Sequence, residues 1–318
     1  MTLPADSAHL SDVDVALMLD QYGGGVESQF AKESFMRSYA VVRNVTGTDT
    51  IVNNRVGKTQ LQKLVPGVRP DAIPTAFGKV QLTVDTVILA RDNRSMLNEF
   101  QTHFEARAEL AKDHGKEMGK FFDEAFVIMG IKGAGQAAPS GLNGAIGAGK
   151  SVTLSAALDE LDPDKLYTAI ATIITQMQEE DIDTSECVIL VRPTQYDVLL
   201  NNDKLIDKQF SANGDFAGGT FSTLKGSRVI STARIPKAAI TGHRLSNASN
   251  GNAYDVSATE AKAVAVILHP KSLLAGETIP LQSDIWFSKE EKQWFIDSFM
   301  AFAVTVNRPD VCGRVLKA

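Results

Sequence analysis

One long helix dominates the pattern of apolar and polar positions along the chain. Between Leu97 and Met129, apolar or small residues recur at spacings of three and four, as in a helix with one buried face. The stripe consists of Leu97, Phe100, Phe104, Ala108, Ala111, Gly115, Met118, Phe122, Ala125 and Met129. About 35 residues at 1.5 Å each predict a rod of roughly 50 Å. In the middle of the stripe the side chains are small, at Ala108, Ala111 and Gly115. We therefore expect another element to cross the helix closely there.

Strands precede this helix and enclose a long loop. Residues 41–45 and 50–52 carry strand-type side chains, and GKVQLTVDTVILA (78–90) alternates apolar and polar positions, as a strand exposed on one face does. The segment between them, GKTQLQKLVPGVRPDAIPTAFG, holds three prolines and three glycines. Such a connection is too long for an ordinary hairpin turn and predicts a functional protrusion.

Helices and strands alternate in the second half of the chain. Asp162 and Pro163 give an N-cap and first-turn signal for a helix. CVILVR (187–192) and AVAVILH (263–269) have the composition of buried strands. This alternation predicts an α/β unit. The last forty residues predict long strands with aromatic side chains, which return to pack on an element already formed.

Composition and charge exclude several classes of protein. The 318 residues are 44% hydrophobic, carry a net charge of −6 and contain no long basic block, so tight, salt-sensitive DNA binding is not expected. Two cysteines and five histidines lack the spacing of a metal site, and we predict neither metal nor cofactor. The acidic N-terminal residues do not fit a signal peptide, and no run of 18 apolar residues predicts a membrane span.

The sign of the charge reverses along the first 70 residues. Residues 1–33 hold six acidic residues against one basic residue, a net charge of −5, whereas residues 34–70 hold six basic residues against one acidic residue, a net charge of +5. Two solvated faces are the commoner explanation of such runs. The alternative is contact across a subunit boundary, and our candidate contact residues for it are Lys58, Lys63, Arg69, Asp12, Asp14 and Asp20.

Gly144, Gly149, Lys150 and Ser151 match the spacing of a phosphate-binding loop, but their context does not. The preceding residues, QAAPSGLN, cannot form the buried entry strand that such a loop needs, and no apolar strand ends in the Asp that would hold Mg²⁺. Seven glycines between positions 130 and 149 make a chance match easy, and we interpret the run as a flexible linker. With no other catalytic pattern in the sequence, we predict that the chain is not an enzyme.

The order of these parts resembles the Hong Kong 97-type capsid fold, and within it the major capsid proteins of the T-seven group of short-tailed bacteriophages (Autographiviridae). The resemblance spans nearly the whole chain. It rests on YGGGVESQFAKES, VGKTQLQKLVPGVRP, CVILVRPTQYDVLL, AVILHPKSLLAGETIPLQSDIWF and NRPDVCGRVL. Each motif is weak alone, and their order and spacing carry the likeness. The loop at 241–257 departs most from the family.

The resemblance implies an α+β fold with named parts. They are an N-terminal arm (1–44), an extended β-loop (45–90), a peripheral domain with its spine helix and linker (91–149), an α/β axial domain (150–275), and C-terminal strands returning to the peripheral domain (276–318). It implies a structural protein of the virion that forms hexamers and pentamers of an icosahedral head. Its implied partners are other copies of itself, a scaffolding protein, a portal protein, weakly held double-stranded DNA and a decoration protein, with assembly in the bacterial host cytoplasm.

Two alternative functions and one chemical possibility stay open at this point. An encapsulin-like shell around cargo enzymes resembles the same fold, and a nucleotide-dependent enzyme would use Gly144 to Ser151. Some relatives with this fold cross-link Lys to Asn between subunits, and Lys58 or Lys63 with Asn307 would be the residues here. The T-seven group is not known for that chemistry, and we do not expect it.

Overall fold

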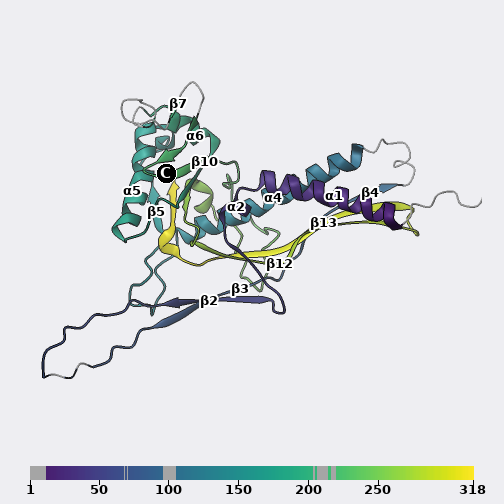
Figure 1. Cartoon of the computed structure of the whole chain (residues 1–318). Helices are drawn as coiled ribbons and strands as arrows, with labels where there is room; N and C mark the ends of the chain where they lie inside the picture. The colour runs from purple at the N-terminus through teal and green to yellow at the C-terminus, as the bar shows by residue number, and fades with distance from the viewer. Residues whose placement is uncertain are drawn as a thin grey trace, which may run out of the picture. The chain divides into compact units, whose positions relative to one another are not determined.

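The computed structural model describes residues 12–67, 69, 71–95, 105–202, 205, 214–215 and 220–318, without the side chains of 12–18, 105–107, 214–215 and 220. The chain divides into two compact units, drawn together in Figure 1. Unit 1 comprises the described residues up to Tyr39 with Val84–Asp123 and Glu277–Phe302; unit 2 comprises Ala40–Thr83, Glu124–Gly276 and Ala303–Ala318.

Unit 1 is built on two helices that lie side by side, α1 (Asp12–Glu33) and α4 (Glu105–Gly133), the latter continuing into unit 2 (Figure 1). A short helix, α2 (Met36–Tyr39), follows α1. The core of this unit joins both helices to two long strands, β12 (Leu273–Ser288) and β13 (Gln293–Val306). It is formed by Tyr22, Val26, Ala111, Ile285 and Ile296. The described part of the N-terminal arm (1–44) therefore begins with two helices, α1 and α2, which the sequence analysis did not predict, and ends in strand β1 (Val42–Asn44) at the residues predicted as a strand.

The predicted close crossing of the rod occurs at Gly115. A Cβ atom placed on Gly115 would lie 2.4 Å from the carbonyl oxygen of Val26, so no larger residue fits where α1 crosses α4. Gly119, one turn later, approaches Glu33 in the same way. The predicted stripe is wrong at Ala108, which is exposed.

The four-stranded sheet has the order β1-β12-β13-β4, with β1 at Val42–Asn44 and β4 at Ile88–Ser95. The strand predicted over 78–90 is not continuous. Its first part belongs to β3 (Phe77–Thr83), which pairs with β2 (Thr50–Val56), and its second part belongs to β4, which pairs with β13. Residues 84–87 carry the chain from one sheet to the other, because the two parts find different partners.

The core of unit 2 is a six-stranded sheet of order β5-β14-β11-β6-β10-β9, covered by α5 (Pro163–Glu179). Its strands are β5 (Lys150–Thr153), β6 (Val188–Val191), β9 (Thr223–Leu224), β10 (Ser227–Ser231), β11 (Ala263–Leu268) and β14 (Cys312–Leu316). The predicted α/β alternation is confirmed here, as is the N-cap, since the Asp162 carboxylate accepts from the amides of Asp164 and Lys165. The other described elements are η1 (Asp159–Leu161), α6 (Pro193–Leu200), β7 (Gly214–Asp215), β8 (Thr220–Phe221), η2 (Glu260–Lys262) and η3 (Pro309–Val311).

The C-terminal strands belong to two different sheets. β12 and β13 pass through both units, but β14 lies inside the six-stranded sheet, between β5 and β11. A Cβ atom on Gly313 of β14 would lie 2.5 Å from Ile173 of α5, so this strand packs closely under the helix. The last residues therefore complete the core of unit 2, whereas we expected the whole of 276–318 to return to the peripheral region.

The glycine-rich run after position 130 is only partly a linker. Gly130 and Gly133 lie inside α4, where a Cβ atom would come within 2.6 Å of Leu268 and 2.8 Å of the Cys312 sulfur, respectively. These two glycines permit close packing of α4 on the six-stranded sheet. Turns without helix or strand occupy residues 134–149.

Candidate functional site: the loop between β2 and β3

The candidate site is an antiparallel two-stranded ribbon with a long loop at its end. β2 and β3 pair from Thr50 opposite Thr83 to Val56 opposite Phe77, and residues 57–76 connect them. Alternate side chains of the ribbon face outward and are exposed, as the alternation in the sequence predicted for 80–83. A two-stranded ribbon is only marginally stable alone, so its neighbours matter.

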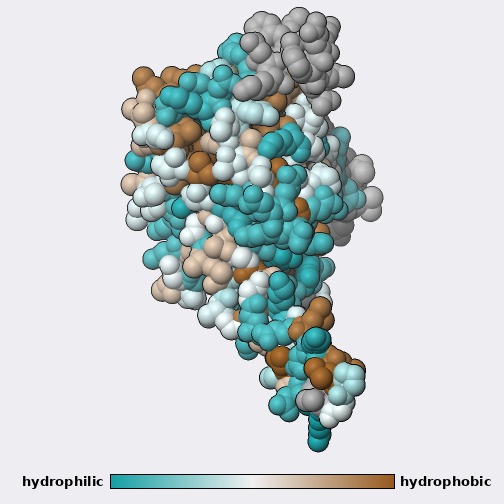
Figure 2. Space-filling model, turned by 90° about the vertical axis from the view of Figure 1, so that its left-hand side faces the viewer, coloured by the Kyte–Doolittle hydropathy of each residue, from teal (hydrophilic) through white to brown (hydrophobic). Residues whose placement is uncertain are grey.

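Apolar side chains are exposed along this loop to an unusual degree. Thirteen large hydrophobic residues are exposed in the part of the chain that the structure describes, and seven of them lie between Val52 and Phe77. Leu61 is 96% exposed, Phe77 75% and Leu64 71%. Figure 2 shows brown apolar atoms beside teal polar atoms at the narrow lower end of the surface, which the loop forms. Such a concentration marks a surface that binds another protein.

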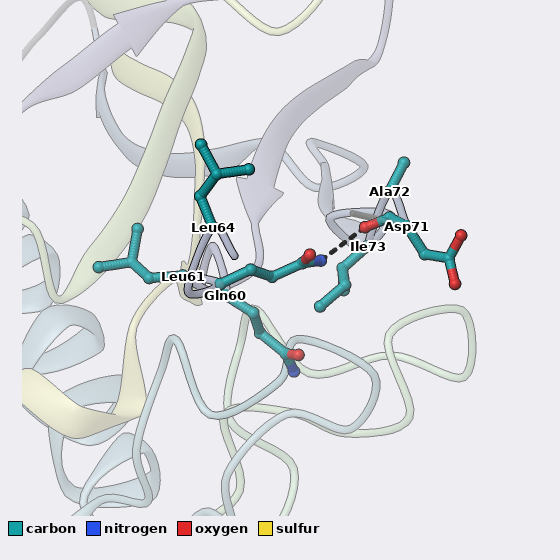
Figure 3. A pocket seen from close by; sticks show the side chains of 7 residues that line it. Gln60, Leu61, Leu64, Asp71, Ala72 and Ile73 are labelled. Atoms are coloured by element: carbon teal, nitrogen blue, oxygen red, sulfur yellow. Dashed lines mark hydrogen bonds between the residues drawn. The ribbon is translucent and has the colours of Figure 1, made fainter. Parts of the chain in front are cut away.

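A hydrogen bond joins the two arms of the loop beside a shallow hollow. The Gln62 side-chain amide donates a hydrogen bond of 2.7 Å to the backbone carbonyl of Asp71. The hollow is lined by Gln60, Leu61, Gln62, Leu64, Asp71, Ala72 and Ile73, and Figure 3 shows their side chains. Polar and apolar groups therefore alternate at the tip.

The three basic residues predicted as contacts all lie on this loop. Lys58, Lys63 and Arg69 are exposed, and none of them forms an ion pair with the described residues of its own subunit. Among the acidic candidates, Asp20 is exposed on α1 and forms no ion pair either, while the side chains of Asp12 and Asp14 lie outside the described residues. The charges of the loop thus have no ion partner among the described residues of their own subunit.

The base of the loop is fastened to the body of unit 2. Asn53 donates to the Asn307 side-chain oxygen at 2.8 Å, and Asn307 donates to the Lys271 carbonyl at 3.1 Å. Arg55 donates to the backbone carbonyls of Asn307 and Val306. Burial lowers the pKa of Arg55, and the nearby Asp310 carboxylate opposes that shift. We refer to Asn53, Arg55 and Asn307 as the loop clasp.

The clasp was missed by sequence reasoning, as were the exposed apolar residues. Arg55 and Arg37 are two of the six basic residues between positions 34 and 70, but both make contacts within their own subunit. Arg55 donates to backbone carbonyls, and the Arg37 guanidinium lies 2.8 Å from Glu277. The signal for Leu61 and Leu64 was present, because leucines in a proline-punctuated polar loop have no core to enter. No sequence signal connects Asn53 with Asn307.

The segment that matches a phosphate-binding loop has the wrong structure for that chemistry. Lys150 and Ser151 begin strand β5 and pair with β14, whereas a phosphate-binding loop continues into a helix. The Lys150 ammonium pairs with the Glu180 carboxylate, which packs against Gly147. The expectation that Lys150 sits in a flexible linker is therefore wrong, because the strand and this ion pair hold it.

No group of three or more His, Cys, Asp or Glu that could hold a metal ion occurs among the residues that the structure describes. Within the same residues, no helix is long and apolar enough to cross a membrane. Both cysteines are buried and free, and burial raises the pKa of the Cys187 thiol to about 12.

Comparison with solved structures identifies the architecture. Over 90% of this chain and 87% of the other, the structure superposes on a chain of the bacteriophage PhiM1 mature capsid with a TM-score of 0.78 and 26% sequence identity. The chain has the Hong Kong 97-type capsid fold. The capsid of cyanophage P-SCSP1u gives a TM-score of 0.80 at 16% identity, covering 90% of this chain and 88% of that one. A chain of Mycobacterium phage Che8 gives 0.61 at 16% identity, covering 84% of both.

No protein-family model matches the sequence, and no curated protein is similar enough to match. The Hong Kong 97-type fold confirms the predicted fold class, an α+β chain with an arm, an extended β-loop, a long helix and an α/β domain. The motifs behind this prediction are each weak. At this low sequence identity, their order and spacing along the chain indicated the fold.

Proposed function

We propose that the chain is the major capsid protein of a bacteriophage, and that its copies assemble into hexamers and pentamers of an icosahedral head around double-stranded DNA. The observation that carries this proposal is the likeness to a mature capsid over 90% of the chain, at 26% identity and a TM-score of 0.78. The motifs quoted above favour a short-tailed phage of the T-seven group. The parts then take the names arm (1–44), extended loop (45–90), peripheral domain (91–149 with β12 and β13) and axial domain (150–275, completed by β14).

The loop between β2 and β3 supports the proposal on physical grounds. Burying a leucine side chain contributes about 1.5 to 3 kcal/mol, which Leu61 and Leu64 forgo in a lone subunit. The Gln62–Asp71 hydrogen bond joins the arms of the loop near its tip, and the loop clasp fixes its base. The loop therefore presents these leucine side chains in a defined geometry. Such a loop gains its burial when it lies across a neighbouring copy, and Lys58, Lys63 and Arg69 on its surface then meet acidic groups of that copy.

The remaining partners follow from the same function. A scaffolding protein would guide assembly, a portal protein would occupy one vertex, and a decoration protein would bind the outer surface. The acidic net charge of −6 suits a shell that encloses DNA by weak, non-specific contact, because strong phosphate contacts would impede packaging and ejection. The product of assembly is the virion, formed in the bacterial host cytoplasm.

Electron microscopy of the purified protein, expressed with and without the scaffolding gene of the same phage, tests the proposal. We expect closed shells of regular size with the scaffold. Leu61→Ser with Leu64→Ser should give folded subunits that form no shells, while Leu158→Ser, which changes a leucine of 67% exposure outside the loop, should assemble normally. Absence of shells from the wild-type protein under all conditions would contradict the proposal.

Two outcomes would favour the alternatives. Shells that form without scaffold and contain a peroxidase or ferritin-like protein would indicate an encapsulin-like compartment. Saturable binding of ATP that is abolished by Lys150→Ala would favour the nucleotide-dependent enzyme. The strand conformation of Lys150 does not favour that alternative.

A further inference from the structure

Helix α1 contains a feature that its packing does not explain, three consecutive glycines at Gly23, Gly24 and Gly25. Each glycine in a helix interior destabilises the helix relative to alanine, because its backbone loses more freedom on folding. Close packing accounts for Gly25 alone, where a Cβ atom would lie 3.3 Å from the Ala111 Cβ. At Gly23 the nearest atom would be at an ordinary 3.8 Å, and at Gly24 nothing lies within 4 Å.

The part of α1 after the glycines is held firmly. Val26 and Phe30 are buried, and the Val26 carbonyl lies against Gly115 at the helix crossing. Beyond the end of α1, the buried Asp123 carboxylate accepts from the Ser34 hydroxyl at 2.6 Å and from the amides of Phe35 and Met36 at 3.0 and 3.1 Å. Three hydrogen bonds to one carboxylate fix this end of the helix on α4.

Among the described side chains before the glycines, Leu19 packs against the core of unit 1, and Tyr22, which adjoins the glycines, is buried in that core and forms the hydrogen bonds. Its hydroxyl lies 2.7 Å from Nδ1 of His114, and Nε2 of His114 lies 3.0 Å from the Asp92 carboxylate. A carboxylate only accepts, so Nε2 carries a proton, and in the neutral imidazole Nδ1 then accepts from the tyrosine hydroxyl. Ser298 adds a contact of 3.3 Å to the same hydroxyl. We refer to Tyr22, His114 and Asp92 as the latch.

We propose that Gly23–Gly25 is a hinge, across which residues 12–22 undock from α4 as one unit when the latch opens, while Val26 and the residues that follow stay docked. Gly23 and Gly24 form a weak point without a packing reason, placed between a firmly held segment and one whose described anchors are the latch and the side chain of Leu19. That is the arrangement that such a device requires. Residues 12–22 carry Asp12, Asp14 and Asp20 and no basic residue. If the proposed shell function holds, the hinge lets this acidic segment reach basic loops of neighbouring copies at different angles.

Amide hydrogen exchange of the full-length, unassembled subunit tests the hinge. In the wild type we expect residues 12–22 to exchange together and faster than residues 26–33, with the boundary at the glycines. Gly24→Ala should slow exchange of 12–22 about fivefold, since alanine is favoured there by helix propensity and meets no atom. Tyr22→Phe keeps the ring and removes the latch hydrogen bond, and should speed the same exchange about three- to tenfold.

Ser28→Ala is the matched control, since it raises helix propensity at an exposed position of α1 beyond the hinge. It should leave exchange of 12–22 unchanged. A helix that simply frays from residue 12 would show a gradient of rates without a boundary and no response to Gly24→Ala, and either result would overturn the hinge.

Assembly kinetics then test the use of the hinge. Gly24→Ala should assemble more slowly than wild type, and Ser28→Ala at the wild-type rate. Equal rates for all three proteins, with slowed exchange in Gly24→Ala, would overturn the role in assembly. Failure of the wild type to form shells would count against the proposed function and leave the exchange result standing, so the two failures are distinguishable.

Discussion

The six-stranded sheet and the loop between β2 and β3 use similar aliphatic side chains in opposite ways. Under α5, Ile170, Ile173 and Met177 are fully buried against the strands, and this core belongs to unit 2 alone. On the loop, Leu61 and Leu64 extend into solvent and contact no core. The free energy of burial is therefore realised within the subunit in one region and only on association in the other.

This difference separates folding from assembly. A substitution in the sheet should change the stability of the lone subunit, whereas one on the loop should change only what the subunits form together. The arm helix lies between these extremes, because its crossing at Gly115 is closely packed while Gly24 has no atom within 4 Å of a Cβ position.

Matched aliphatic truncations test the comparison most directly, and here we expect the largest effect. Ile173→Ala should lower the free energy of unfolding by roughly 2 to 5 kcal/mol, because it opens a cavity under α5. Leu61→Ala should lower it by less than about 0.5 kcal/mol, because the side chain is already in water. Urea denaturation of the unassembled subunit measures both. Similar values for the two variants would show that the loop is packed in the subunit after all.

Gly115→Leu tests the crossing of the arm over α4. The new side chain would overlap the Val26 carbonyl, and overpacking of this kind costs roughly 1 to 3 kcal/mol or more. We expect insoluble or misassembled protein. Lys116→Leu, which places the same side chain at the next, exposed position, should remain soluble and assemble. Regular shells from Gly115→Leu at normal yield would mean that the crossing is not tight.

The two regions were also unequally predictable from the sequence. The sheet and α5 follow from local signals: β-branched runs at 187–191 and 263–268, and the Asp162–Pro163 start of the helix. The loop was located by its prolines and flanking strands, but its clasp joins Asn53 to Asn307, and a contact between residues so far apart leaves no local pattern.

The remaining errors have the same physical origin. The break at residues 84–87 depends on which strands β3 and β4 pair with, and pairing is a property of the whole fold. Likewise, α1 was not predicted because its glycines oppose helix formation locally, and packing on α4 overrides that preference. Of the predicted contact residues, the three basic ones could be located on the loop, but only an assembled shell shows what they meet.

Lys150→Ala tests the body of unit 2 rather than a nucleotide site. The ion pair with Glu180 is largely buried on the lysine side, but the carboxylate is 39% exposed and stays accessible to water, so loss of the pair should cost about 0 to 1 kcal/mol. We expect soluble protein that still assembles but unfolds at a lower urea concentration. The variant Lys150→Ala with Glu180→Gln should recover part of the loss. No change in the urea midpoint would show that the pair is solvated.

The latch gives a pH dependence with a defined sign. Burial raises the pKa of Tyr22 from 10.0 to about 12, so the protonated hydroxyl is favoured in the folded state. This contribution is complete below pH 10 and is lost as the pH rises from 10 towards 12. The difference in unfolding free energy between wild type and Tyr22→Phe should therefore shrink over that range, and groups common to both proteins cancel. A difference that stays constant to pH 12 would mean that Tyr22 titrates normally.

Of the changes considered, those to the loop charges should have among the smallest effects per contact. They also test most sharply whether the loop acts in assembly while the sheet acts in folding. An exposed pair contributes about 0 to 1 kcal/mol, but a symmetric shell repeats each contact once per subunit. Lys58→Glu, Lys63→Glu and Arg69→Glu together should give folded subunits that form no shells, because these side chains have no ion partner among the described residues of their own subunit. Wild-type assembly should also weaken as the Debye length falls from about 10 Å towards 3 Å.

The control for the charge change is the triple reversal of Lys116, Lys237 and Lys289 to Glu, three exposed lysines outside the loop. It alters the net charge by the same amount and should leave assembly intact. Reversing Asp12, Asp14 and Asp20 to Lys in the loop variant should partly restore shells if arm and loop of neighbouring copies meet. If the loop variant assembles normally at low salt, its charges are merely solvated, and the exposed leucines alone would have to hold the loop on its neighbour.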